Sequence, residues 1–287
     1  MSEIELVIAA KDELGEGPLW HPAEQALYWV DIEGRLYHRY QPGTGEHEVV
    51  RVGMRIGALA FRASGGLLLA AESGFAFFDP ASGSLTMLAN PEENKPNTRF
   101  NDGAVDRAGR FWAGTLGDPR ANHLYRFDPA RAVTCMENGV DISNGIGWSP
   151  DNRVMYYVDS TPGRIYAYDF DLGGGVISNR RILVDRSALP GVPDGLTVDA
   201  HGFLWVAVWG GSCLERYTPS GKLERRIDLP VEFPTSVTFG GPEMTDLYIT
   251  SAQVDIPIAD RARFPLAGNL FRLRNAGQGL PEPYFAG

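Results

Sequence analysis

Hard oxygen donors recur at one position of a repeating pattern in this chain. Three of them, Glu16, Asn144 and Asp194, each stand directly before a glycine that enters a short apolar stretch. Two carboxylates and one amide are ligand types that suit Ca²⁺, Mg²⁺ or Mn²⁺, and three protein ligands leave positions for water or a substrate. Asp-Gly and Asn-Gly pairs are also common in turns, so each pair alone is weak evidence. Their shared position, with a glutamate that no turn requires, favours a divalent-metal site.

The pattern comprises six stretches in which a small residue enters an apolar strand, and the small residues lie 40 to 50 positions apart. A period of this length is typical of repeated supersecondary units. If the units close into a ring, equivalent positions face one central space, so residues distant in sequence meet there. The residues before the small residue, here called the register position, are Glu16, Ile56, Asp102, Asn144, Asp194 and Thr235.

Most segments between these stretches are typical of short strands, separated by clusters of Gly, Pro, Asp and Asn. Six four-stranded units predict an all-β fold, a six-bladed β-propeller that forms a single domain over residues 1–287. An open β-sandwich would leave the six-fold register unexplained. The sixth unit lacks an outer strand, which residues 4–8 can supply, and no amphipathic helix is evident. In the first unit the expected strands are 17–21, 26–31, 35–40 and 46–52.

Composition excludes several classes of partner. The net charge is −10 and the basic residues are scattered, which argues against nucleic acid and against an anionic membrane surface. No segment approaches about 18 consecutive apolar residues, and residues 1–10 do not resemble a signal peptide, so a cytoplasmic location is expected by default. Cys135 and Cys213 are too few for a disulfide framework, and we expect two reduced thiols. The sequence leaves the oligomeric state open.

Several stretches together carry a family resemblance: 14–20 (LGEGPLW), 99–103 (RFNDG), 113–115 (AGT), 143–145 (SNG), 193–196 (PDGL) and 208–211 (VWGG). In this order and spacing, from about residue 13 to about residue 252, they resemble the senescence-marker-protein, gluconolactonase and luciferin-regenerating-enzyme family. The resemblance implies a six-bladed propeller with one divalent metal ion in its channel and an activity that hydrolyses sugar lactones. Calcium is the favoured ion, with magnesium, manganese, zinc and iron as alternatives.

The resemblance also implies roles for individual residues. At 116–119 the chain reads Leu-Gly-Asp-Pro and departs from members that carry an acidic substrate contact there, so Asp118 is a candidate counterpart only. This departure leaves the hydroxyl pattern of the substrate open. The implied metal ligands are Glu16, Asn144 and Asp194, and the implied substrate contacts are Arg99 and Asn101.

Ester hydrolysis needs an activated water, a polarised carbonyl and stabilisation of the oxyanion. Asp194 is the candidate general base. Asp102 shares the register position and is either the acid–base residue instead or a support for the loop that carries Arg99. Arg99 offers a fixed fork of donors for substrate oxygens, and Asn101 can donate to a carbonyl or a hydroxyl.

The predicted function is therefore metal-dependent hydrolysis of a sugar lactone to the aldonic acid, in carbohydrate catabolism. One alternative is a non-catalytic calcium-binding or regulatory propeller that uses the same site. Another is a hydrolase of other esters or of organophosphates. Arg99 and Asn101 favour the enzyme, because a purely structural metal would not need them.

Other residues that often do chemistry fit less well. Trp20, Trp148 and Trp209 could stack on a sugar ring, but their strand positions favour packing within blades. Ser143 precedes Asn144 without an obvious base, and the five histidines are scattered, so a serine-hydrolase triad is rejected.

Overall fold

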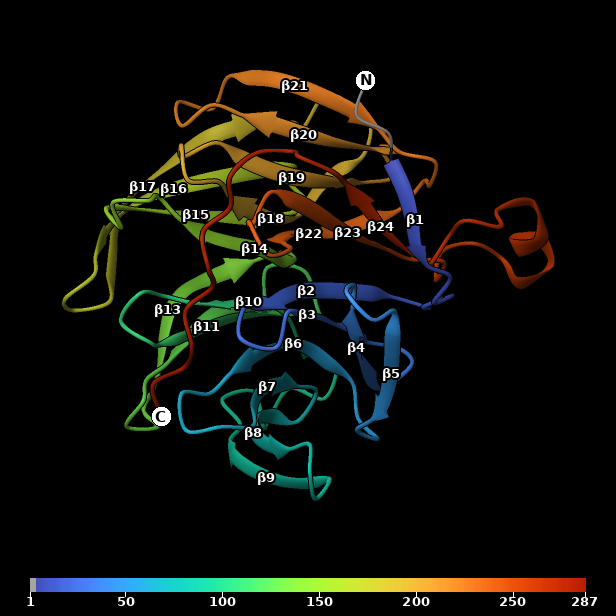
Figure 1. The fold of residues 1–287 in the computed structure, drawn as a ribbon. Helices are drawn as coiled ribbons and strands as arrows, with labels where there is room; N and C mark the ends of the chain where they lie inside the picture. Colours follow the sequence, from blue (N-terminus) through green and yellow to red (C-terminus); the bar gives the residue numbers. More distant parts are fainter. Residues whose placement is uncertain (1–3) are drawn as a thin grey trace.

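The computed structural model describes residues 4–287, which form six four-stranded antiparallel sheets arranged in a ring (Figure 1). In the first five sheets the strands follow one another in chain order, from the channel outward. The predicted six-bladed β-propeller is confirmed. Blades one to three comprise β2 (Gly15–His21), β3 (Ala26–Asp31), β4 (Leu36–Gln41) and β5 (Glu46–Arg51); β6 (Ile56–Phe61), β7 (Leu67–Ala71), β8 (Gly74–Asp79) and β9 (Ser84–Ala89); β10 (Arg99–Val105), β11 (Phe111–Leu116), β12 (Asn122–Phe127) and β13 (Val133–Val140). Blades four and five comprise β14 (Ser143–Trp148), β15 (Val154–Asp159), β16 (Arg164–Asp171) and β17 (Val176–Asp185); β18 (Val192–Val198), β19 (Leu204–Trp209), β20 (Cys213–Tyr217) and β21 (Leu223–Asp228).

The sixth blade combines both ends of the repeat. Its strands run in the order β22 (Pro234–Gly240), β23 (Asp246–Ser251), β24 (Leu270–Leu273) and β1 (Ile4–Ile8). The outer pair has Ile4 opposite Leu273 and Leu6 opposite Phe271, so the predicted use of the N-terminal run is confirmed. Between β23 and β24 lies a short 3₁₀-helix, η1 (Ile258–Arg263). Within residues 4–287, no helix is long and apolar enough to cross a membrane.

Three small residues of the repeat, Gly57, Gly145 and Gly195, lie tightly against the neighbouring inner strand. The inner strands β2, β6, β10, β14, β18 and β22 contact one another in this order, and β22 contacts β2 again, which closes the ring. A Cβ on Gly57 would lie 2.3 Å from the carbonyl oxygen of Asn101, and one on Gly145 would lie 2.6 Å from the amide nitrogen of Leu196. Larger residues would therefore push neighbouring inner strands apart.

A β-bulge occurs at the register position of every inner strand or directly after it. Each inner strand shifts its register against the second strand of its blade at this point. In β18, for example, the shift lies between Pro193 and Leu196, so Asp194 and Gly195 are the bulged residues. Bulges interrupt the regular alternation of side chains and can re-aim them. The repeat thus brings side chains such as Asp194 toward the channel.

After β24 the chain continues as an extended segment, residues 275–287, that crosses one end of the ring (Figure 1). It bonds to the blades through backbone groups: Ala276 to Thr245 in blade six, Gln278 to Ala200 in blade five, and Phe285 to Phe61 in blade two. The Phe285 side chain is completely buried in an apolar cluster of blades two and three. The segment therefore ties together blades that the repeat alone would not connect.

Candidate functional site

A pocket of about 240 Å³ opens where the inner strands begin. Of the seven predicted site residues, the structure brings five to its lining: Glu16 from β2, Arg99 and Asn101 from β10, Asn144 from β14 and Asp194 from β18. All five except Arg99 are buried, at 4 to 5% exposure. Four blades thus contribute polar groups to one small volume, and three of these groups, Glu16, Asn144 and Asp194, stand at the register position.

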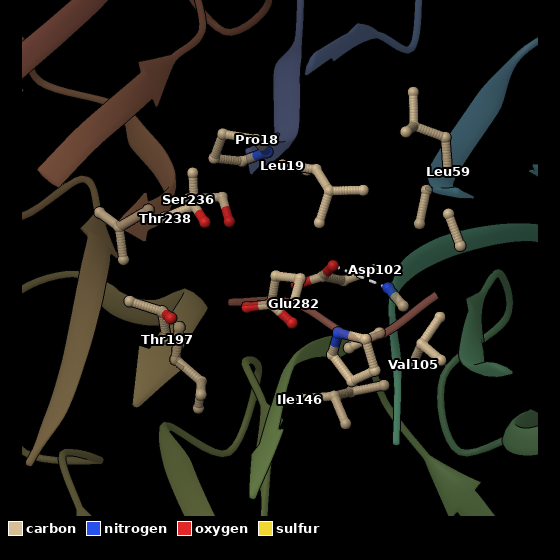
Figure 2. Close-up of a pocket in the computed structure, with 18 residues that line it drawn as sticks. Pro18, Leu19, Leu59, Asp102, Val105, Ile146, Thr197, Ser236, Thr238 and Glu282 are labelled. Atoms are coloured by element: carbon tan, nitrogen blue, oxygen red, sulfur yellow. Dashed lines mark hydrogen bonds between the residues drawn. The ribbon is translucent and has the colours of Figure 1, made fainter. Parts of the chain in front are cut away.

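Asp102 faces a different space. It lines a smaller cavity of about 50 Å³, which Figure 2 shows. Its Oδ1 accepts a hydrogen bond of 2.7 Å from the amide of Gly103. The same cavity contains Glu282, which comes from the C-terminal segment, and Figure 2 shows the two carboxyl groups in the middle of the channel. Glu282 was not predicted from the sequence, because it follows the last repeat and has no register partner.

A chain of hydrogen bonds crosses three blades and orients the amides of the pocket. Arg99 Nη1 donates to Asn101 Oδ1 at 2.7 Å, and Asn101 Nδ2 donates to Asn144 Oδ1 at 3.1 Å. Asn144 Nδ2 donates to Ser160 Oγ at 2.9 Å, and Ser160 donates to the carbonyl oxygen of Pro193 at 2.7 Å. Asn144 therefore keeps its amide oxygen, not its nitrogen, on the side away from Ser160.

Two consequences follow from this chain. Asn101 has both ends of its amide engaged by protein groups, since Nδ2 also donates to the carbonyl oxygen of Ser143 at 2.8 Å. It therefore positions Arg99 and Asn144 as much as it offers itself to a substrate. Ser160, which directly follows β15, was missed in the sequence because no equivalent serine recurs in the register.

The carboxyl groups of the channel destabilise one another's ionised forms. Burial raises the pKa of Glu16 to about 8, with a further increase from the nearby charge of Asp102. Burial also raises the pKa of Asp194, helped by the charges of Glu16 and Asp102, and it raises the pKa of Asp102 to about 6. Burial lowers the pKa of Arg99, an effect that the charges of Glu33 and Glu16 oppose. Additional positive charge in this space would therefore be stabilised.

The donor set fits a hard divalent cation. Asp194 Oδ1 is buried and has no hydrogen-bond partner among the described residues, which is costly unless a ligand satisfies it. Glu16 Oε2 accepts a hydrogen bond of 3.1 Å from the backbone amide of Gly17. Within residues 4–287, no three His, Cys, Asp or Glu side chains are grouped as a metal site. The candidate set of Glu16, Asn144 and Asp194 combines two carboxylates with an amide oxygen, which are the ligands of Ca²⁺ and Mg²⁺.

Several other predicted residues lie outside this arrangement. Asp118 is exposed in the turn after β11 and does not line the pocket. Trp20 is buried and stacks on Tyr248 with ring centroids 5.9 Å apart, as expected for blade packing, whereas Trp209 lines the pocket. Cys135 is exposed and Cys213 is buried, and both are free thiols, as predicted.

Known proteins match nearly the whole chain in sequence. A regucalcin from Danio rerio is 39% identical over 292 residues, which cover 99% of this chain and 99% of that protein. A pentonolactonase from Haloferax volcanii is 38% identical over 285 residues, which cover 96% of each.

Solved structures and family models agree with these relatives. The structure of a regucalcin from Agrobacterium tumefaciens, described as a calcium-binding protein, superposes with a TM-score of 0.95 at 29% identity and covers 99% of this chain and 97% of that one. The model of the SMP-30/Gluconolactonase/LRE-like region matches residues 14–253. The chain therefore belongs to the SMP-30/gluconolactonase/LRE-like family.

Proposed function

We propose that this protein is a divalent-metal-dependent lactonase that hydrolyses sugar lactones to aldonic acids in carbohydrate catabolism. The observation that carries the proposal is the convergence of Glu16, Asn144, Asp194 and Arg99 on one pocket. The pentonolactonase that is 38% identical over nearly its whole length supports the same substrate class. A cation held by Glu16, Asn144 and Asp194, with calcium the favoured ion, would polarise a carbonyl oxygen and lower the pKa of a water molecule.

The protein's own groups account for the proton and for orientation. Asp194 lines the pocket with its Oδ1 unpartnered within residues 4–287, which supports it as the group that accepts a proton from the attacking water. Asp102 lines the separate inner cavity, which favours Asp194 as the base. The new bond joins the water oxygen to the lactone carbonyl carbon. The ring C–O bond then breaks, and its oxygen takes up a proton to become the hydroxyl of the aldonic acid.

Arg99 is the donor for substrate oxygens in this scheme. Its Nη1 already serves Asn101 and the carbonyl oxygen of Phe100, whereas its Nε and Nη2 make no hydrogen bond within residues 4–287. Charged donors that are fixed in this way contribute to binding before and during the reaction.

Arg99→Ala is expected to raise the KM for a sugar lactone by roughly tenfold or more, with a smaller decrease in kcat. The removed donors bind oxygens whose charge changes little between substrate and transition state. Steady-state kinetics of the purified variant measure the split. Arg153→Ala, at an arginine side chain that is 84% exposed, is the matched control and should match the unmodified protein. A loss confined to kcat would contradict the assigned binding role.

A panel of aldonolactones of pentoses and hexoses, assayed at neutral pH with and without EDTA, tests the proposed function itself. We expect hydrolysis of at least one lactone, abolition of the activity by EDTA and recovery on addition of excess calcium or magnesium. Hydrolysis that survives complete chelation would remove the metal from the proposal. No hydrolysis of any lactone by the metal-loaded protein would overturn the enzymatic function.

The second candidate is a calcium-binding protein without catalysis. It is favoured by the regucalcin relatives, one of which is described as a calcium-binding protein. In that case calorimetry would detect calcium binding that requires Glu16 and Asp194, while the whole lactone panel would remain unhydrolysed. Hydrolysis of other esters or of organophosphates is a variant of the first candidate, and the same assay can include those substrates.

A further inference from the structure

The lining of the pocket is divided by depth. The buried lining residues are all polar: Glu16, Asn101, Asn144, Ser160 and Asp194. The half-buried lining residues, apart from Arg99, are all apolar, and we call them the apolar collar: Leu14, Leu116, Ile142, Val192 and Trp209. The polar floor and the apolar collar therefore form two successive layers.

Three collar residues lie just before the inner-strand positions of the floor residues that are proposed to hold the cation. Val192 stands two residues before Asp194, and Leu14 and Ile142 stand two residues before Glu16 and Asn144 in the same way. Each floor residue proposed to hold the cation thus has an apolar lining residue two positions earlier in the chain, and that residue is more exposed.

Backbone pairing fixes the rest of the collar. Leu116 is bridged to Ile142, and Val192 pairs with Trp209. The indole of Trp209 also packs against Phe233 with ring centroids 4.8 Å apart. Because neighbouring strands hold these residues in place, the collar has little freedom to turn a polar group toward the pocket.

We propose that the apolar collar selects lactones whose far end is apolar, such as deoxy sugar lactones that carry a methyl group where a common sugar lactone carries a hydroxymethyl group. This inference rests on the proposed function, because lactone hydrolysis requires the carbonyl at the floor beside Asp194. Ring substituents remote from the carbonyl then face the collar. On the side of the pocket away from Arg99, a hydroxyl placed against the collar finds no hydrogen-bonding side chain among these apolar residues, whereas a methyl group gains burial.

The test compares matched substrates that differ by one oxygen. A pentono-1,4-lactone and its 5-deoxy analogue are assayed for kcat/KM with the metal-loaded protein. We expect the deoxy analogue to be preferred by roughly tenfold, the size of discrimination that an apolar pocket commonly provides. Val192→Thr, which keeps the side-chain shape and adds a hydroxyl to the collar, should reduce this preference severalfold.

The matched control is Val49→Thr, the same change at a position on β5 that is 50% exposed. It should leave the preference unchanged. Equal or better use of the hydroxylated lactone by the unmodified protein would overturn the inference, as would an unchanged preference in Val192→Thr. Circular dichroism of each variant confirms that the propeller has formed.

Binding of the corresponding sugar lactams, measured by calorimetry, separates this inference from the proposed function. A deoxy lactam that binds about tenfold more tightly than its hydroxylated partner, with the difference reduced in Val192→Thr, supports the collar even if no lactone is hydrolysed. Lactones that are hydrolysed with no preference for the deoxy member contradict the collar and leave the proposed function standing.

Discussion

Asp194→Asn is expected to reduce kcat for sugar lactone hydrolysis by roughly 10³-fold or more. The substitution keeps the shape of the side chain but removes both the negative charge proposed to hold the cation and the group proposed to accept a proton. General-base catalysis alone commonly contributes 10²- to 10⁴-fold, and the loss of a cation adds to it. Steady-state kinetics at saturating calcium, together with calorimetric titration of calcium, measure both effects.

Two matched substitutions accompany this variant. Asp228→Asn changes an aspartate side chain that is 87% exposed on β21 and should leave kcat unchanged. Asp102→Asn tests the alternative base and should cost much less than Asp194→Asn, because Asp102 lines the inner cavity and not the pocket. If Asp102→Asn abolished turnover while Asp194→Asn retained it, the assignment of the base would be reversed. Near-normal turnover in Asp194→Asn would end the metal-lactonase proposal.

The metal-free protein is expected to lose thermal stability as the pH rises from about 5 to about 8. Burial raises the pKa of Glu16 to about 8 and that of Asp102 to about 6, so both carboxyls bind their protons more tightly in the folded than in the unfolded chain. Such groups contribute fully to stability below their unfolded pKa, and the contribution is lost as the pH rises through the folded value. The expected loss is on the order of a few kcal/mol, or about 5–10 °C in Tm.

Calorimetry in EDTA across this pH range measures the loss, and saturating calcium at pH 8 should reverse it by favouring the ionised carboxylates. Because other groups titrate as well, the useful quantity is the difference in Tm between the unmodified protein and Glu16→Gln. The Tm of Glu16→Gln should depend less on pH than the Tm of the unmodified protein. Glu48→Gln, at a glutamate side chain that is 58% exposed, serves as the control. Parallel Tm curves for the unmodified protein and Glu16→Gln would refute the unfavourable burial of this carboxyl.

The sequence was sufficient to predict the architecture. The register has a local cause at several positions, because a Cβ at Gly57 or Gly145 would collide with the neighbouring inner strand. Turn residues and alternating apolar positions then delimit the other strands. The pairing of residues 4–8 with the last blade was also predictable, since an outer strand was missing there. The sequence likewise predicted that Glu16, Asn144 and Asp194 would converge on one pocket, because equivalent positions of a closed ring face its axis.

Tertiary structure decided the position of each side chain along the channel. The adjacent residues Asn101 and Asp102 both lie in the bulged part of β10, yet they line different cavities. Likewise, the exposed position of Asp118 depends on how the turn after β11 projects from its blade. A register based on spacing cannot resolve such differences, since it fixes which strand a residue occupies and not how far it lies from the mouth.

Contacts between blades were equally invisible in the sequence. Ser160 joins the hydrogen-bonded chain only because blade four places it beside the carbonyl oxygen of Pro193 in blade five. Glu282 enters the channel because residues 275–287 cross the ring after the last repeat. The sequence by itself determined the repeat and the chemical type of the site, because both follow from short-range residue patterns. Only the closed ring decided the depth, partners and protonation of each group, because these depend on neighbours contributed by other blades.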